Sequence, residues 1–229
     1  RLRWGGLVVL ASAEDAGRST VGQVGRFVRD LRAPHLAGML GKDAAGRGIV
    51  LPAHYYALHP MTEMRLPVPM EMALAIARRE SEFDPSVASG VGALGLMQVM
   101  PATAKEVAEG LGIDYARDSV LNDWTYNATL GAAYLATLSE RYDGNVVMMS
   151  AAYNAGPSRP DRWVSEQGDP RKGEMDVIDW IEAIPFNETR NYVMRVAESL
   201  PVYRARLGKA AHPVPFTEEL NGPTLHVRY

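Results

Sequence analysis

The stretch from Met70 to Glu82 constrains the fold most, because it reads as a helix whose apolar side carries an acid. It contains neither Gly nor Pro, and Pro69 before it suits an opening turn. At 3.6 residues per turn, Met72, Ile76 and Glu80 stack on one side of this helix. Burying an unpaired carboxylate is costly, and the negative end of the helix macrodipole adds to that cost. Both effects should raise the pKa of Glu80 from about 4.3 towards roughly 6–7, so that it can deliver a proton at neutral pH.

A glycine-rich loop follows this predicted helix. The Pro after Asp84 ends the helix, and three glycines within residues 90–95 let the backbone lie close to another backbone or to a ligand. Leu96–Met100 is predicted to be a short strand or extended run, before Pro101 opens the next helix. The acid would then face a glycine-rich wall that carries an amide and two thioethers.

Four short motifs occur in one order along the chain. They are R-E-S at Arg79–Ser81, G-A-L-G-L-M-Q-V-M-P at Gly92–Pro101, A-A-Y-N-A-G-P at Ala151–Pro157 and I-P-F-N-E-T-R-N-Y-V at Ile184–Val193. Through these motifs, residues 58–207 resemble the soluble lytic transglycosylases, which cleave peptidoglycan. The resemblance implies a mainly α, lysozyme-like fold of the goose type with at most a very small β element.

Helical patterns also dominate elsewhere, and the alternation that marks strands is almost absent. Residues 1–56 are predicted to form two or three helices, the first within 19–33. By the resemblance they would end an α-superhelical domain, and an ordinary packing subdomain is the alternative. Residues 57–208 would form the catalytic domain, with a polar loop at 113–123, and the Pro-rich residues 209–229 would form an extended tail.

Two asparagines are predicted to cap helices of the catalytic domain. Asn145 precedes a short, almost wholly apolar helix over residues 146–153, which should be buried on all sides. Asn187 precedes the final long helix over residues 188–207. Within that helix, Pro201 should force a kink or a break.

Composition argues against several classes of function. The 229 residues include no Cys, so disulfides and thiolate metal sites are excluded, and the five His lack metal-ligand spacing on one helix. We therefore expect no metal or other cofactor. The net charge of -3, without a basic stripe interleaved with aromatic residues, gives no reason to expect nucleic acid as a partner. No apolar run is long enough to cross a membrane.

Charge is distributed unevenly along the chain. Residues 1–60 contain 8 basic and 4 acidic side chains, which leaves 16 basic and 23 acidic side chains for residues 61–229. Any attraction of the acidic catalytic part to an anionic wall polymer must therefore be local. Since the chain begins at Arg1 without an initiator Met or a signal peptide, we expect it to be processed or cut from a longer protein.

Glu80 is the candidate catalytic acid, because glycoside cleavage needs a proton on the leaving oxygen. Glu82 lies about 200° further round the helix, at roughly 100° per residue, and is predicted to be solvated or structural. Asp84 reads as a turn residue, so no second carboxylate is offered nearby. A salt bridge with Arg78, Arg79 or a distant cation is the structural alternative for Glu80.

The resemblance implies a reaction that needs only one carboxyl group. In lytic transglycosylases a single Glu acts first as acid and then as base, while the C6 hydroxyl of the muramic acid attacks C1. The product is a 1,6-anhydro ring, and no water is consumed.

The resemblance also implies which other residues contact substrate. They are Ser89, Gln98, Met100, Tyr153, Asn154 and Glu188. For Tyr153 the alternative is a core residue with a satisfied hydroxyl. For Glu188 it is simple stabilisation of a helix N-terminus. Gly90 after Ser89 departs from the bulkier residue or Pro expected there.

The leading hypothesis is a lytic transglycosylase that cleaves the β-1,4 bond between MurNAc and GlcNAc. Peptidoglycan glycan strands would be its partner, in the periplasm of a Gram-negative bacterium. A goose-type lysozyme-like hydrolase, which delivers water to the same bond, is the first alternative. The second is a catalytically silent peptidoglycan-binding module of a larger envelope complex, whose other partners stay open.

Overall fold

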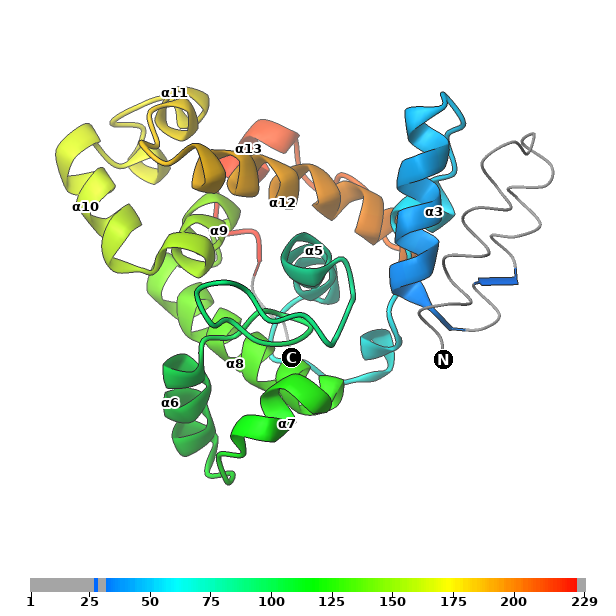
Figure 1. Ribbon diagram of the computed structural model, residues 1–229. Helices are drawn as coiled ribbons and strands as arrows, with labels where there is room; N and C mark the ends of the chain where they lie inside the picture. Colours follow the sequence, from blue (N-terminus) through cyan, green and yellow to red (C-terminus); the bar gives the residue numbers. More distant parts are fainter. Residues whose placement is uncertain (1–26, 29–31, 226–229) are drawn as a thin grey trace. The chain divides into compact units, whose positions relative to one another are not determined.

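The structure is a computed structural model that describes residues 27–28 and 32–225 (Figure 1). Most of the helix predicted within residues 19–33 lies outside the described residues. Within the described part the chain is helical, and strand pairing is limited to two isolated bridges, which join residues 88 to 94 and 94 to 99. This agrees with the predicted mainly α class.

The chain forms two compact units. The smaller unit comprises the described residues up to Met64, together with Glu82–Asp84. In it, α3 packs against α4, and a small apolar cluster forms around Val28, Ala37 and Ala57. Its helices are α3 (Pro34–Gly46), α4 (Pro52–Tyr55) and the 3-10 helix η1 (Pro60–Glu63). That these helices end a superhelical domain stays a prediction.

The larger unit comprises Arg65–Ser81 and the described residues from Pro85 onwards. Two helices, α5 and α9, form its centre: residues 71–77 of α5 and residues 146–152 of α9 are all buried. Helix α12 packs along both of them, and α8 packs against α9 (Figure 1). The helices of this unit are α5 (Met70–Ser81), α6 (Pro101–Leu111), α7 (Arg117–Asn122), α8 (Trp124–Tyr142), α9 (Val146–Ala155), α10 (Ser158–Gln167), η2 (Pro170–Lys172), α11 (Val177–Glu182), α12 (Asn187–Arg206) and α13 (Phe216–Asn221).

Side-chain caps explain where α8 and α9 begin. The carboxylate of Asp123 accepts hydrogen bonds from the backbone N–H groups of Thr125 and Tyr126. The side chain of Asn145 accepts one from the N–H of Met148, so the predicted cap is confirmed. These contacts satisfy backbone donors that a helix start leaves unpaired.

Two short-range predictions are wrong. Residues 113–123 are not only loop, because they contain α7, whose Val120 is fully buried. Leu96–Met100 is not a strand, because residues 95–98 form a turn that is closed by the pairing of Leu94 with Val99. Burial of Val120 accompanies the helix, and the backbone pairing of Leu94 with Val99 closes the turn.

The prediction for the final long helix is partly wrong. Helix α12 begins at Asn187, with Phe186 in the capping position and no side-chain cap. The helix also continues through Pro201. Proline removes one backbone donor, but Leu200 and Tyr203 on either side are fully buried, and their packing keeps the last turns in place.

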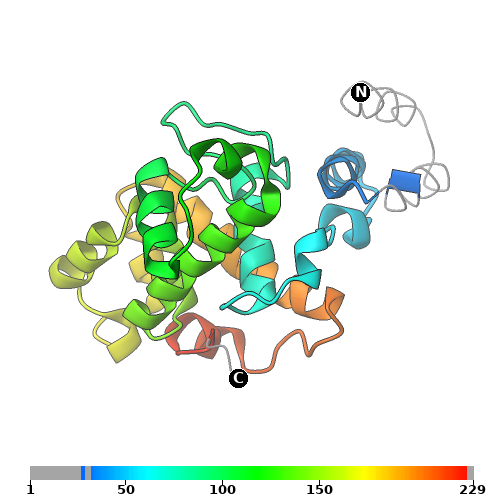
Figure 2. The ribbon, with the colours of Figure 1, turned by 90° about the horizontal axis from the view of Figure 1, so that it is seen from below.

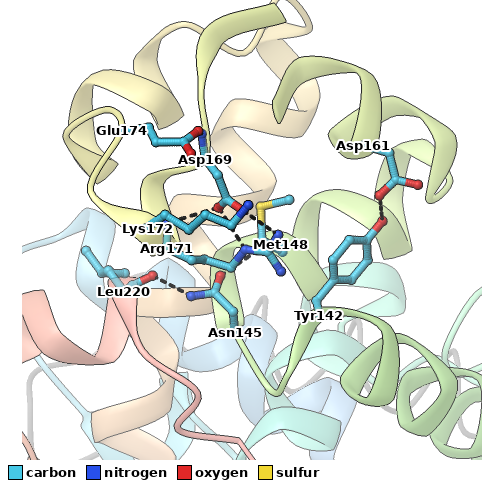
Figure 3. A network of polar contacts seen from close by, with 9 residues as sticks. All are labelled: Tyr142, Asn145, Met148, Asp161, Asp169, Arg171, Lys172, Glu174 and Leu220. Atoms are coloured by element: carbon cyan, nitrogen blue, oxygen red, sulfur yellow. Dashed lines mark hydrogen bonds and ion pairs between the residues drawn. The ribbon is translucent and has the colours of Figure 1, made fainter. Parts of the chain in front are cut away.

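The predicted extended tail is wrong as well, because α13 forms within it. Leu220 and Leu225 are buried, and the amide of Asn145 donates to the Leu220 carbonyl at 2.8 Å (Figure 3). Helix α13 lies against α9 (Figure 2). The C-terminal segment therefore completes the core around the central helices.

Candidate active site

Glu80 lies in the last turn of α5, where α12 covers it. The hydroxyl of Tyr192, a buried residue of α12, donates a hydrogen bond to Oε1 of Glu80 at 2.6 Å. Burial raises the pKa of Glu80 to about 7, and the negative charge of Glu188 adds to the effect. It outweighs the Tyr192 hydrogen bond and the charge of Arg79, which both lower the pKa. A large fraction of Glu80 is thus protonated near neutral pH.

The salt-bridge alternative for Glu80 is not what the structure shows. Within the described residues, no Lys, Arg or His forms an ion pair with its carboxylate. The guanidinium of Arg79 instead lies 5.8 Å from the centre of the Tyr192 ring and donates to the side chain of Asn191 at 3.4 Å. The acid is therefore held by a neutral phenol.

Glu82 behaves as predicted for a structural carboxylate. It forms an ion pair with Lys42 within the smaller unit, and each of the two side chains keeps about two fifths of its surface in solvent. Such a solvated pair contributes little to stability.

The glycine-rich loop is a braced turn rather than a flexible segment. Leu94 and Val99 pair through two backbone hydrogen bonds of 3.1 and 3.0 Å. Both Gly95 (φ 75°) and Gln98 (φ 48°) adopt left-handed backbone conformations. The amide nitrogen of Gln98 donates to the carbonyls of Val87 and Gly95, both at 2.9 Å. Gln98 thus stabilises the loop that it belongs to.

The remaining loop candidates differ in their surroundings. The hydroxyl of Ser89 accepts a hydrogen bond from the N–H of Ala93 at 2.9 Å, so it braces the loop. Met100 precedes α6 and is 42% exposed. Neither residue forms a hydrogen bond or ion pair with Glu80 within the described part of the chain. Their contact with substrate stays a prediction.

Helix α9 brings Tyr153 close to the acid. The Tyr153 hydroxyl donates to the Met97 carbonyl at 2.8 Å, and its ring lies 5.4 Å from that of Tyr134. Burial and then the nearby charge of Glu80 raise the pKa of Tyr153 well above its ordinary range. Tyr153 therefore joins the loop to the surroundings of Glu80, with its hydroxyl already satisfied.

Asn154 and Glu188 lie where α9 meets the first turn of α12. The Oδ1 atom of Asn154 accepts a hydrogen bond from the Thr189 hydroxyl at 2.7 Å. Glu188 is exposed in the first turn of α12, and its charge still acts on Glu80. The structure thus gathers Glu80, Tyr153 and Glu188, and it joins Asn154 to the same helix ends.

Sequence reasoning missed Tyr192, which makes the closest contact with the acid. It belongs to the motif Ile184–Val193 and lies four residues after Glu188. Residues four apart share one face of a helix, so this spacing was the available signal. What the spacing cannot indicate is a hydrogen bond to a helix 112 residues earlier in the chain.

The site centres on the buried carboxyl of Glu80. Among the described residues, no three His, Asp or Glu side chains lie close enough to hold a metal ion. Likewise, none of the helices described is long and apolar enough to span a membrane. With a pKa of about 7, the carboxyl of Glu80 is able to give up and take back a proton near neutral pH.

Comparisons with known proteins agree with this arrangement. The family described as the transglycosylase SLT domain matches residues 61–175. The soluble lytic murein transglycosylase of Escherichia coli (strain K12) is 39% identical over 142 residues, which are 62% of this chain and 21% of that protein. This chain thus spans about a fifth of the length of that relative.

Solved structures show the same fold. The 70 kDa soluble lytic transglycosylase Slt70 from Escherichia coli superposes with a TM-score of 0.77 and 30% identity, covering 89% of this chain and 33% of that one. A 70 kDa soluble lytic transglycosylase in complex with bulgecin A gives a TM-score of 0.76 and 29% identity, over 90% and 33% of the two chains. These matches confirm the helical, lysozyme-like fold predicted from the motifs.

Proposed function

Because the chain belongs to the family of the transglycosylase SLT domain, we propose that it is a lytic transglycosylase of peptidoglycan. It would cleave the β-1,4 bond between MurNAc and GlcNAc, with Glu80 as the acid. The observation that supports this proposal best is the pKa of Glu80, about 7, in a carboxyl group held by the Tyr192 hydroxyl. No other described carboxylate forms a hydrogen bond with it.

The proposed reaction uses the Glu80 carboxyl twice. Protonated Glu80 gives its hydrogen to the bridging oxygen, and the bond between that oxygen and C1 of MurNAc breaks. The carboxylate that remains then accepts the proton of the C6 hydroxyl, while the C6 oxygen bonds to C1. Glu80 is protonated again at the end, and the product carries a 1,6-anhydro ring without any water consumed.

The neighbours of Glu80 would serve the two halves of this cycle. Burial and the charge of Glu188 favour the protonated acid before cleavage. The Tyr192 hydroxyl favours the carboxylate after cleavage, because a hydrogen bond donated to a charged oxygen stabilises the charge. A pKa near 7 keeps both forms accessible, as a group that acts as acid and then as base requires.

The other predicted residues would line the groove for the glycan strand. Tyr153 and Gln98 support this assignment: Gln98 belongs to the braced loop, and Tyr153 donates a hydrogen bond to it and has its pKa raised by the nearby charge of Glu80. Ser89, Met100 and Asn154 would contact the substrate, as the motifs imply. The similar enzymes come from Gram-negative bacteria, so we also propose the periplasm as the place of action.

Mass analysis of sacculi digested by the full chain tests the proposal. We expect 1,6-anhydro ends, and we expect Glu80→Gln to slow their release by about a thousandfold or more, since it removes the transferable proton. Glu82→Gln is the matched control, because it changes a solvated carboxylate near the end of the same helix and should keep most activity.

Each other outcome excludes one element of the proposal. Reducing ends after complete digestion would mean hydrolysis by water, as in goose-type lysozymes. If Glu80→Gln digested sacculi as fast as the parent, the acid assignment would be wrong. If the parent bound sacculi but released no product, the chain would be a binding module. Bulgecin A, which is bound in the solved structure of a similar enzyme, should compete with the glycan.

A further inference from the structure

A fully buried amide lies behind the glycine-rich loop. Asn127, in the first turns of α8, has no exposed surface. Its Oδ1 accepts a hydrogen bond from the Met97 N–H at 2.7 Å. Its Nδ2 donates to the carbonyls of Leu94 and Val120, both at 2.8 Å. One side chain therefore joins α8, α7 and both sides of the turn at residues 95–98.

The fit between this amide and the loop is close. A Cβ atom at Gly95 would lie 2.5 Å from both Nδ2 of Asn127 and the carbonyl oxygen of Val120, closer than real contacts allow. Only glycine fits at this position, where the backbone is also left-handed. The loop therefore rests directly on the amide, without room for a water molecule between them.

Two further helices bind carbonyl groups of the same turn. The Ser81 hydroxyl of α5, next to Glu80 in the chain, donates to the Leu96 carbonyl at 2.6 Å. The Tyr153 hydroxyl of α9 donates to the Met97 carbonyl at 2.8 Å. Among the side chains that the structure describes, Asn127 alone binds a backbone N–H of the turn and also the carbonyl at its start. Its loss would take the acceptor from the buried Met97 N–H and one donor from the Leu94 carbonyl.

We propose that Asn127 is a positioning residue for substrate binding. It holds the turn at residues 95–98, so that Gln98 and the contact between Tyr153 and the turn are already in position before the glycan binds. This inference rests on the proposed function, because it takes the loop to be one wall of the glycan groove. The amide acts through the loop and touches no substrate. Its effect is to remove the cost of ordering the loop on binding.

Asn145 offers a matched control within the same chain. It is also a buried asparagine near a helix start, and it also accepts one backbone N–H, that of Met148. Its Nδ2 donates to the carbonyls of Leu220 and Gly222, at 2.8 and 3.3 Å. Figure 3 shows that this amide points to the C-terminal segment. Changing it costs similar hydrogen bonds without releasing the loop.

The test measures glycan binding without turnover. Asn127→Asp and Asn145→Asp are each placed in the full-length Glu80→Gln chain, and the dissociation constant for soluble glycan strands released from sacculi by an amidase is determined. Both changes replace a donor with an acceptor, so both should lower the unfolding temperature. We expect Asn127→Asp to weaken glycan binding about tenfold or more, and Asn145→Asp to change it less than about twofold.

Hydrogen exchange of the Met97 amide gives a second readout that needs no variant. We expect this amide to be strongly protected in the free chain, and its protection to change little when glycan is added. Fast exchange that slows only with glycan would show that the turn forms on binding, and would overturn the proposal even if no Asn127 variant folds. Equal effects of the two Asn→Asp changes on binding would overturn it as well.

The two proposals can fail separately. If the Glu80→Gln chain bound no glycan at all, the proposed function would be at fault. The Met97 exchange rate would still decide whether Asn127 holds the turn. If glycan bound equally well with and without Asn127→Asp, the proposed function would stand and the positioning role would be rejected.

Discussion

At the scale of single residues, the chemistry depends on how the pKa of the Glu80 carboxyl is kept close to neutral pH. Burial alone would favour the neutral acid, while the Tyr192 hydroxyl and the charge of Arg79 favour the carboxylate. The balance lies at a pKa of about 7 for Glu80. An acid with a pKa near the working pH combines sufficient protonation with a sufficient tendency to release the proton.

Tyr192→Phe should shift the pH dependence of activity. The parent needs protonated Glu80, so its activity should decline as the pH rises through about 7. Removing the hydroxyl takes away a hydrogen bond that stabilises the carboxylate, so the pKa of Glu80 should rise and the alkaline decline should move to higher pH. The maximal rate should also fall, by roughly tenfold, because the second half of the cycle loses its support.

The measurement is the initial rate of anhydro-product release between pH 5 and 9. Tyr142→Phe is the control: Tyr142 also donates to a carboxylate, Oδ1 of Asp161 at 2.9 Å, as Figure 3 shows. The activity of Tyr142→Phe should decline at alkaline pH over the same range as that of the parent. A Tyr192→Phe profile that moved to lower pH would contradict the assigned role of the phenol.

The raised pKa of Glu80 should also make the stability of the protein depend on pH. Between its ordinary value of 4.5 and about 7, the folded chain holds a proton that the unfolded chain has lost. Stability from this group is therefore complete below pH 4.5 and declines as the pH rises through 7. At about 1.4 kcal/mol per pH unit, the loss is about 3 kcal/mol.

Glu80→Gln lacks this titration, so its stability relative to the parent should increase by about 3 kcal/mol between pH 4 and pH 8. Urea denaturation at both pH values measures the difference. Glu82→Gln, which changes a solvated carboxylate, should show no comparable trend. A constant difference between Glu80→Gln and the parent would mean that Glu80 is not protonated in the folded chain near neutral pH.

At the scale of helices, α12 supports the acid at one end and secures α5 at the other. Near its C-terminus, buried Arg204 donates to Glu219 of α13 at 2.8 Å and to Glu71, in the first turn of α5, at 3.3 Å. The helix that carries Glu80 is thus tied through α12 to the C-terminal segment.

Arg204→Met should destabilise the protein by about 3–5 kcal/mol, because it leaves buried Glu219 without its cation, whereas Glu71 keeps its ion pair with Lys209. Arg195→Met is the matched change on the same helix, since Arg195 pairs with Glu198 in solvent at 2.9 Å. Its cost should stay below about 1 kcal/mol. Unfolding free energies from urea titrations at pH 7 compare the two, and equal losses would show that the buried pairs matter no more than the surface pair.

The same contacts explain which elements could be predicted from the sequence. Helices α8 and α9 carry their own signals, namely a capping side chain before the first turn and a glycine soon after the last, and α5 carries one in its apolar periodicity. Helix α13 has no such signal, because Pro-rich flanks hide a segment that forms through Arg204 and Asn145. Similarly, α12 passes through Pro201 because packing outweighs one missing hydrogen bond.

The residues of the candidate site also divide into those that the sequence could predict and those that it could not. Glu80 could be found because its position on an apolar face is a property of one helix. Tyr192 and Asn127 act through hydrogen bonds to segments 112 and 30 residues away, and no local pattern encodes such a pairing. Gln98 was expected as a substrate contact, and its role in bracing the loop became visible only with the turn in place.

At the scale of the whole molecule, residues 1–60 and residues 61–229 differ in the sign of their net charge. Residues 61–229, which include the candidate site, hold 16 basic and 23 acidic side chains, whereas residues 1–60 hold 8 and 4. A net negative catalytic part should be repelled by an anionic wall polymer at long range. Contacts in the groove act at short range, where they exclude solvent and are screened less by salt.

Because the whole chain also carries a net charge of -3, salt should strengthen, rather than weaken, its binding to sacculi. From about 20 to 200 mM NaCl the screening length falls from roughly 20 Å to below 10 Å, which removes the repulsion and leaves the groove contacts. The measurement is cosedimentation of the Glu80→Gln chain with sacculi across this range. Soluble glycan strands stripped of their peptides carry fewer charges, so they should show a smaller change. Affinity that fell steeply with salt would mean that a local basic surface, rather than the groove, governs attachment to the wall.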